Sequence, residues 1–325
     1  MSRIGITTTV PVEIILAAGH VPVDLNNIFI TDPSASRLVE EAEEAGYPRN
    51  VCGWIKGLYS VVVNRSGIDK VIAVTQGDCS NTHALMETFE LAGIESIPFA
   101  YPFDRDYDLL KLQMEKLMME LGTNWRAVRE TKNRLDAVRR KVAELDERTW
   151  LEGSVSSLQN HLFQVCCSDF NGSVDQFEAD VDALLASTKN VFASTNGPRL
   201  GFIGVPPIFT DLYNYIETRG GQILFNEVQR QFAMPYEVDD IVEQYRLYTY
   251  PYGVFTRLRD IEAEIKRRQL DGVIHYVQSF CFRQIEDMIF RQKLDVPILT
   301  VEGDKPGKLD ARTKLRIDSF LEMLE

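Results

Sequence analysis

Residues 273–302, VIHYVQSFCFRQIEDMIFRQKLDVPILTVE, decide how this chain folds. An apolar run begins at Val273 and ends in a turn that carries Cys281. A helical pattern follows over Arg283–Leu294, and a second apolar run covers Val296–Val301. Strand, crossover helix and strand make a βαβ unit, and open parallel sheets bind their ligands at the carboxyl edge of the strands. We therefore expect Cys281 to face a crevice rather than the core.

The same plan occurs earlier in the chain. Lys70–Thr75 has the pattern of a buried strand, and the turn after it contains Cys79. A helix over Ala84–Leu91 and a strand over Ser96–Ala100 complete this unit. Because strands alternate with helices in both halves, the sequence predicts an α/β fold of two Rossmann-like domains with mostly parallel sheets.

Two segments indicate the domain organisation. Tyr107–Trp150 is charge-rich with helical periodicity, and we interpret it as a helical hairpin that packs across the N-terminal sheet. Ser194–Pro198 is polar and contains Gly and Pro, which is typical of a linker. We predict an N-terminal α/β domain with a helical region over 1–194, and a C-terminal α/β domain over 195–325.

Composition excludes several classes of function. The formal net charge is −13, whereas a nucleic-acid footprint is basic. No apolar run approaches the roughly 20 residues that span a bilayer. The N-terminal stretch lacks the basic-then-apolar layout of a signal peptide. We expect a cytoplasmic protein that binds neither nucleic acid nor membranes.

The five cysteines are an odd number, which argues against a disulfide scaffold and leaves free thiols or metal binding. Cys52, Cys79 and Cys281 each lead into a helix, and a helix N-terminus lowers the pKa of a thiol. They belong to different predicted domains, so they can meet only in a cleft between the domains. The C-x₂-C pairs of zinc ribbons and ferredoxins are absent. The residues alone leave a three-cysteine metal site and ordinary free thiols both open.

The remaining two cysteines, Cys166 and Cys167, are adjacent. Their side chains diverge on a helix or a strand, so one metal rarely takes both. A partly buried helix end and extra thiolates for a larger cluster are both open readings.

Segments along nearly the whole chain resemble the 2-hydroxyacyl-CoA dehydratase/benzoyl-CoA reductase family, with the D-component of 2-hydroxyglutaryl-CoA dehydratase as its type. The resemblance includes a Pro-x-Glu helix with an Ala-Ala-Gly end, three cysteine segments and a closing helix. The matching stretches are TTTVPVEIILAAGHVPVDL (7–25), VCGWIKG (51–57), GDCSNTHALMETFE (77–90), DGVIHYVQSFC (271–281) and DARTKLRIDSFLEML (310–324).

The resemblance implies that Cys52, Cys79 and Cys281 ligate a 4Fe–4S cluster, with Ser80 and Ser279 as candidate donors of hydrogen bonds to its sulfurs. It implies dehydration of a 2-hydroxyacyl-CoA through a ketyl radical. It also implies two kinds of protein partner, which are an ATP-dependent iron–sulfur activator and a homologous subunit in a homo- or heterodimer. The family's enzymes are lyases without net redox change.

Two alternatives remain beside this expectation. A branch of the family carries a double-cubane cluster of eight irons and reduces small molecules with the same kind of activator. Cys166 and Cys167 are candidates for the additional thiolates that such a cluster needs. The second alternative is an electron-relay subunit without catalysis of its own. Neither the acyl group nor the subunit composition follows from the sequence.

Further residues have both a functional and a structural reading. Thr9 and Glu13 stand at the helix start that the family points toward the cluster, yet threonine there is also an ordinary cap. His83 lies one turn past Cys79, where it moves a proton or simply bonds within its helix. A basic run is either a contact for CoA phosphates or a solvated helix face; it consists of Arg257, Arg259, Lys266, Arg267 and Arg268.

Overall fold

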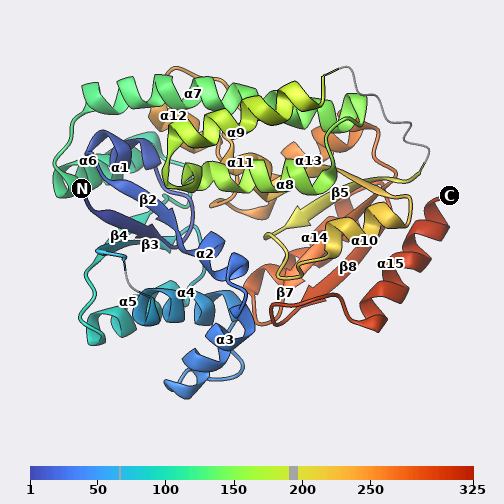
Figure 1. Cartoon of the computed structure of the whole chain (residues 1–325), viewed down its shortest axis with the longest axis horizontal. Coiled ribbons are helices and arrows are strands. Elements are labelled where there is room, and N and C mark those ends of the chain that lie inside the picture. Colours follow the sequence, from blue (N-terminus) through green and yellow to red (C-terminus); the bar gives the residue numbers. More distant parts are fainter. Residues whose placement is uncertain (66, 190–196) are drawn as a thin grey trace.

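The computed structural model describes residues 1–65, 67–189 and 197–325, so residues 194–196 of the predicted linker lie outside the described residues. The chain contains two four-stranded sheets in which all strands are parallel (Figure 1). Their strand orders are β2-β1-β3-β4 and β6-β5-β7-β8. The predicted α/β class with parallel sheets is confirmed.

The first sheet and its helices come from the first hundred residues. The strands are β1 (Arg3–Ile6), β2 (Val21–Asp24), β3 (Lys70–Gln76) and β4 (Ser96–Ala100). The helices are α1 (Val12–Ala17), α2 (Leu25–Thr31), α3 (Ala35–Glu44), α4 (Gly53–Asn64) and α5 (Thr82–Leu91). The short helix α2 was not predicted; it begins because the Asp24 side chain accepts the backbone N–H of Asn26.

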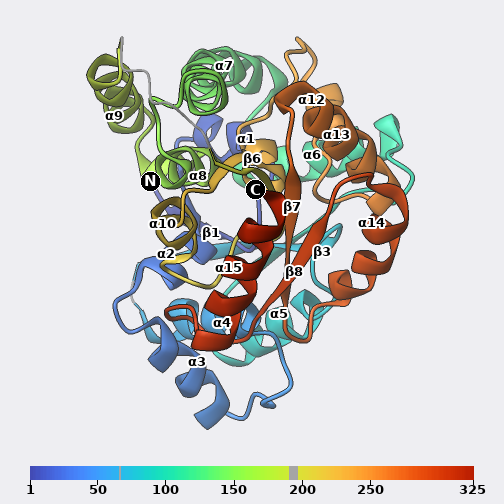
Figure 2. The same cartoon turned by 90° about the vertical axis from the view of Figure 1, so that its right-hand side faces the viewer.

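The second sheet repeats this order. The strands are β5 (Arg199–Gly204), β6 (Gln222–Asn226), β7 (Gly272–Gln278) and β8 (Ile298–Gly303). The helices are α10 (Leu212–Thr218), α11 (Glu227–Phe232), α12 (Ile241–Leu247), α13 (Val254–Arg268), α14 (Asp287–Lys293) and α15 (Ala311–Leu324). The helix predicted from Arg283 is divided, because a 3₁₀ turn over Phe282–Glu286 precedes α14. Helix α15 packs on β8, as expected for the closing helix (Figure 2).

The helical region between the sheets contains α6 (Tyr107–Leu121), α7 (Trp125–Glu147), α8 (Ser157–Val165) and α9 (Val174–Ser187). Helices α6 and α7 form the predicted hairpin and pack on α1. Gly122 ends α6 in the left-handed conformation, and the Asn124 side chain caps α7. The region also reaches the second half, because α8 contacts α11 and β6.

The two halves of the chain pack against each other. One apolar cluster contains Leu58 and Val71 from the first half, and Phe202 and Ile274 from the second. The Tyr245 hydroxyl of α12 lies 3.0 Å from the carbonyl oxygen of Val10. The division at residue 194 therefore stays a prediction. No helix in the described part of the chain is long and apolar enough to cross a membrane.

The strand order locates the site. The central strands β1 and β3 of one sheet, and β5 and β7 of the other, have connections that leave toward opposite edges. In open parallel sheets the ligand crevice forms at the carboxyl ends of such strands. Cys79 follows β3 and Cys281 follows β7, so both lie at these carboxyl ends.

Candidate functional site

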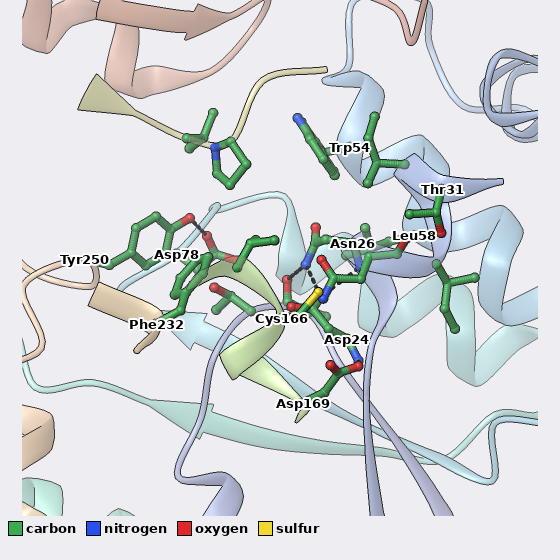
Figure 3. Close-up of a pocket in the computed structure, with 18 of the residues that line it drawn as sticks. Asp24, Asn26, Thr31, Trp54, Leu58, Asp78, Cys166, Asp169, Phe232 and Tyr250 are labelled. Atoms are coloured by element: carbon green, nitrogen blue, oxygen red, sulfur yellow. Dashed lines mark hydrogen bonds between the residues drawn. The ribbon is translucent and has the colours of Figure 1, made fainter. Parts of the chain in front are cut away.

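A cavity of about 390 Å³ lies at the carboxyl ends of both sheets (Figure 3). Its lining includes Thr7 and Thr8, which follow β1, and Val205 and Pro206, which follow β5. Four of the five cysteines line it, and they are Cys52, Cys79, Cys166 and Cys281. The predicted meeting of the three cysteine segments in a crevice agrees with this arrangement.

The three predicted ligands share one local geometry. Each sulfur accepts a hydrogen bond from the backbone N–H two residues further along the chain. The pairs are Trp54 to Cys52, Asn81 to Cys79 and Arg283 to Cys281. Backbone donors aimed at a sulfur stabilise negative charge on it. The repeated placement seen in the sequence thus corresponds to a repeated structure.

The thiol pKa values differ from the prediction. Burial raises the pKa of Cys52 and of Cys79 to about 12, and it also raises the pKa of Cys281. The backbone N–H groups lower each pKa but do not offset the loss of hydration. The expected lowering by backbone N–H groups is therefore present, but the net shift of each thiol pKa is upward because burial outweighs it. A coordinated metal has the opposite effect on the thiol pKa, because it deprotonates a ligating thiol outright.

Two glycines let the first half's cysteine turns lie directly on loops of the second half. A Cβ atom at Gly77, where φ is +98°, would come 2.7 Å from the Pro251 side chain. A Cβ atom at Gly53 would come 2.7 Å from the carbonyl oxygen of Asp304. Both turns are thereby fixed relative to the second sheet, on which the third cysteine stands.

The Cys281 turn is held by the backbone and by a buried arginine. The Cys281 N–H donates to the carbonyl of Gln278 at 3.0 Å. Phe280 has φ +66°, a left-handed conformation that is uncommon outside glycine. Arg283 donates from Nη2 to the carbonyl of Tyr250 at 2.8 Å. Such local strain is typical of functional turns.

The donor set fits an iron–sulfur cluster. Cysteine sulfurs are the ligands that these clusters take, and three of them surround one cavity here. In the described ranges, no three His, Cys, Asp or Glu side chains are grouped closely enough for a single metal ion. A group that contains several iron atoms reaches across a wider set of ligands than one ion does.

The adjacent cysteines separate into two environments. Cys166 lines the cavity, where burial raises the pKa of its thiol to about 12. Cys167 is 1% exposed and packs in the apolar core. Its sulfur donates to the carbonyl of Phe163 at 3.3 Å. Of the two thiols, Cys166 alone faces the cavity.

Two aspartates that the sequence analysis missed also line the cavity. Asp24 ends β2 and Asp169 follows α8, and both are almost fully buried. The Asp24 N–H donates to Asp169 Oδ2 at 2.7 Å, across 145 residues of sequence. Burial, followed by the charge of Asp24, raises the pKa of Asp169 to about 7. Burial likewise raises the pKa of Asp24. No local motif relates these residues, so the sequence carried no signal of the pair.

Glu13 lies outside the cavity lining. Arg139 Nη1 donates to Glu13 Oε1 at 2.6 Å, and the Tyr245 hydroxyl donates to Oε2 at 2.8 Å. Burial raises the pKa of Glu13, but the charge and hydrogen bond of Arg139 overcome it, so the pKa is lowered. This contact joins α1, α7 and α12. The catalytic role considered for Glu13 stays a prediction.

Four other predicted residues likewise do not line the cavity. The Thr9 carbonyl accepts the Tyr101 hydroxyl at 2.9 Å. His83 Nε2 lies 3.0 Å from the Thr75 carbonyl, on the exposed side of α5. The other two are serines: Ser279 donates to Glu302 Oε1 at 2.8 Å, and Ser80 is exposed. Their proposed roles stay predictions.

In the basic helix α13, two arginines fit neither interpretation of the basic run, as a contact for CoA phosphates or as a solvated helix face. Arg257 is buried and pairs with Glu227 at 2.6 Å, and Arg268 is buried and pairs with Glu264 at 2.6 Å. These arginines therefore face neither solvent nor a CoA phosphate. The charge run that looked like a basic surface contains internal ion pairs.

A family model described as 2-hydroxyglutaryl-CoA dehydratase, D-component, matches residues 7–324. A comparison with curated proteins finds no match. The matched range includes all three cysteine turns, the second sheet and every strand of the first sheet except β1, which ends at Ile6.

Proposed function

The chain belongs to the 2-hydroxyglutaryl-CoA dehydratase D-component family, and on this premise we propose that it is an iron–sulfur enzyme that removes water from a 2-hydroxyacyl-CoA. The main support is the common geometry of Cys52, Cys79 and Cys281. Each has a backbone N–H donor on its sulfur, and all three line one cavity.

These three cysteines would hold a 4Fe–4S cluster. When bound, such a cluster would supply one-electron chemistry at low potential to the thioester, with no net redox change over the dehydration. The backbone N–H groups at the sulfurs stabilise negative charge there. Trp54, Leu58 and Phe232 give the cavity an apolar wall that limits water near the reacting thioester.

Near the cysteines, Asp78 and Tyr250 form a partly buried polar contact. The Tyr250 hydroxyl donates to Asp78 Oδ1 at 2.8 Å. Burial raises the pKa of Asp78 above its ordinary value. The carboxyl group thereby holds its proton more tightly than in water, and the hydroxyl fixes its orientation toward the site.

We further propose two protein partners, following the family assignment. A separate ATP-hydrolysing iron–sulfur activator would deliver the electron, and a homologous subunit would complete a homo- or heterodimer. The test is a reaction with anaerobically purified protein, activator, ATP and a panel of 2-hydroxyacyl-CoA thioesters. We expect ATP-dependent formation of enoyl-CoA, which Cys281→Ala abolishes. Cluster-loaded protein that binds none of the thioesters and only passes electrons would contradict catalysis and support a relay subunit.

Cys166 favours a second candidate function. Its thiol faces the same cavity as the three predicted ligands, as an additional ligand of a double-cubane cluster would. A protein with this cluster would reduce small molecules with the same kind of activator. Iron and acid-labile sulfide after anaerobic purification separate the two candidates, with about four of each per chain for the dehydratase and about eight irons for the reductase.

A further inference from the structure

We propose that Asp24 and Asp169 form the acyl-recognition end of the cavity, which accepts a distal hydroxyl or ammonium group of the acyl chain and rejects a second carboxylate. The inference rests on the proposed function, because it assumes that an acyl-CoA enters this cavity. It names the substrate class that the family assignment leaves open.

The two carboxyl groups form a built, buried site. Asp24 and Asp169 are 3% and 6% exposed, and both line the cavity. The Asp24 carboxylate accepts the N–H of Asn26 at 2.9 Å, and Asp169 Oδ1 accepts the N–H of Asn171 at 2.9 Å. These backbone donors hold both carboxyl groups in place at the cavity wall.

The charge of the pair is not neutralised by the protein. In the described part of the chain, neither carboxylate forms an ion pair with Lys or Arg, and buried carboxylates are usually paired. Two arginines line the cavity, and both are engaged elsewhere. Arg3 Nε donates to the carbonyl of Gly67 at 2.8 Å, and Arg283 donates to the carbonyl of Tyr250 at 2.8 Å.

The neighbours of the pair are neutral polar groups. Asn27 donates toward the Ser168 hydroxyl at 3.4 Å, and Asn26 Nδ2 donates to Asp24 Oδ1 at 2.9 Å. Both carboxyl groups stand in one cavity wall without a cationic partner in the described part of the chain, so they oppose the entry of a further negative charge. Carboxyl oxygens accept hydrogen bonds and therefore suit a hydroxyl or an ammonium group. They repel the distal carboxylate of a glutaryl chain.

The cavity also connects the pair to the cysteines. Figure 3 shows Asp78 and Tyr250 on one side and Asp24, Asn26 and Thr31 on the other, with Cys166 drawn between them. Apolar side chains complete the lining, among them Trp54, Leu58 and Phe232. A thioester near the cysteines would extend its acyl chain past these groups toward the carboxyl pair.

The test compares two thioesters of equal length. Binding of 2-hydroxyglutaryl-CoA and of 2,5-dihydroxypentanoyl-CoA to the anaerobically purified, cluster-loaded protein is measured by calorimetry, with acetyl-CoA as a reference. We expect the terminal hydroxyl to give at least about tenfold tighter binding than the terminal carboxylate, because like charges oppose each other in a buried site.

Two variants assign the preference to the pair. Asp169→Asn removes one carboxylate, and Asp24→Asn removes the other while keeping a good helix cap. We expect each to reduce the preference to about threefold or less. Asp175→Asn is the matched control, because the Asp175 side chain is 93% exposed, and we expect it to keep the wild-type preference.

Three outcomes would overturn the inference. The first is equal or tighter binding of 2-hydroxyglutaryl-CoA by the wild type. The second is an unchanged preference in both folded variants. The third, failure of every thioester including acetyl-CoA to bind, would overturn the proposed function as well, whereas the first two leave it standing.

Discussion

The cavity has two ends that differ in origin. The cysteine end consists of turns that each follow a local pattern, with a cysteine leading into a helix and a backbone N–H on its sulfur. The acid end joins Asp24 with Asp169, which come from elements unrelated in sequence. The cysteine motif can be recognised from the sequence alone. The contact between Asp24 and Asp169 is created by tertiary packing, so the sequence gives no sign of it.

The two ends also differ in what holds them. The cysteine turns depend on close backbone contacts between the halves, at Gly53 and Gly77. The acid end depends on hydrogen bonds to the backbone of Asn26 and Asn171. Changes near each end should therefore separate cluster binding from acyl selection, and changes outside both should affect neither.

The largest loss of stability is expected outside both ends, from Glu13→Gln. This variant leaves Arg139 buried without its main charge partner, although Nε and Nη2 already lack hydrogen bonds. Breaking a buried pair by removing one partner costs about 3–5 kcal/mol. Urea denaturation measures the free energy of unfolding.

Glu44→Gln is the control, because the Arg37–Glu44 pair is exposed to solvent and its loss should change the free energy of unfolding far less. We expect the iron content of folded Glu13→Gln to match the wild type. Loss of activity in a folded variant with normal iron content and normal thioester binding would instead assign Glu13 to catalysis.

A smaller effect, specific to the cysteine end, is expected from Gly77→Ala. The new methyl group would meet Pro251 at 2.7 Å, on a backbone with φ +98°. Overpacking and strain together cost about 1–3 kcal/mol, and the displaced Cys79 turn should hold less iron. Thermal unfolding and iron analysis of the same samples measure both effects.

Gly93→Ala separates strain from contact. Gly93 also has a positive φ, of +75°, but nothing lies within 4 Å of its added Cβ. It should lose stability through strain alone, by about 1 kcal/mol, and keep its iron. Equal iron loss in both variants would argue against the contact at Pro251.

The smallest effect concerns the pH dependence of the acid end. The pKa of Asp169 in the folded protein is about 7, above the ordinary value of 3.8. A raised carboxyl pKa gives stability that is present at low pH and is lost as pH rises through the folded value. The difference in Tm between wild type and Asp169→Asn should therefore fall between about pH 4 and pH 7.

Asp175→Asn should run parallel to the wild type over the same pH range, because the Asp175 side chain is exposed. A constant difference between wild type and Asp169→Asn would show that the acid end does not take up a proton on folding.

The sequence predicted what local patterns encode. Both βαβ units, the hairpin of α6 and α7, and the placement of Cys281 at a strand end follow from hydrophobic periodicity and turn residues. Helix α2 was missed because its start depends on the single cap Asp24. The burial of Arg257 and Arg268 was missed because partners on other elements decide it, and a charge run alone normally indicates a solvated face.

The lowered thiol pKa values were predicted from helix N-termini alone, a local effect. Burial outweighs that effect, and burial depends on the whole fold. The same limitation explains the unseen carboxyl pair. Local chemistry could be inferred from residue order, whereas desolvation and long-range contacts could not.

The most direct test of the account is the iron and acid-labile sulfide content of five single Cys→Ala variants, purified anaerobically beside the wild type. We predict that replacing Cys52, Cys79 or Cys281 removes most of the iron, whereas replacing the core residue Cys167 leaves it at the wild-type level in folded protein. In the dehydratase account, the Cys166 variant also keeps its iron. A folded wild type without iron, or variants at Cys52, Cys79 and Cys281 that all retain full iron content, would contradict the claim that these cysteines hold a cluster.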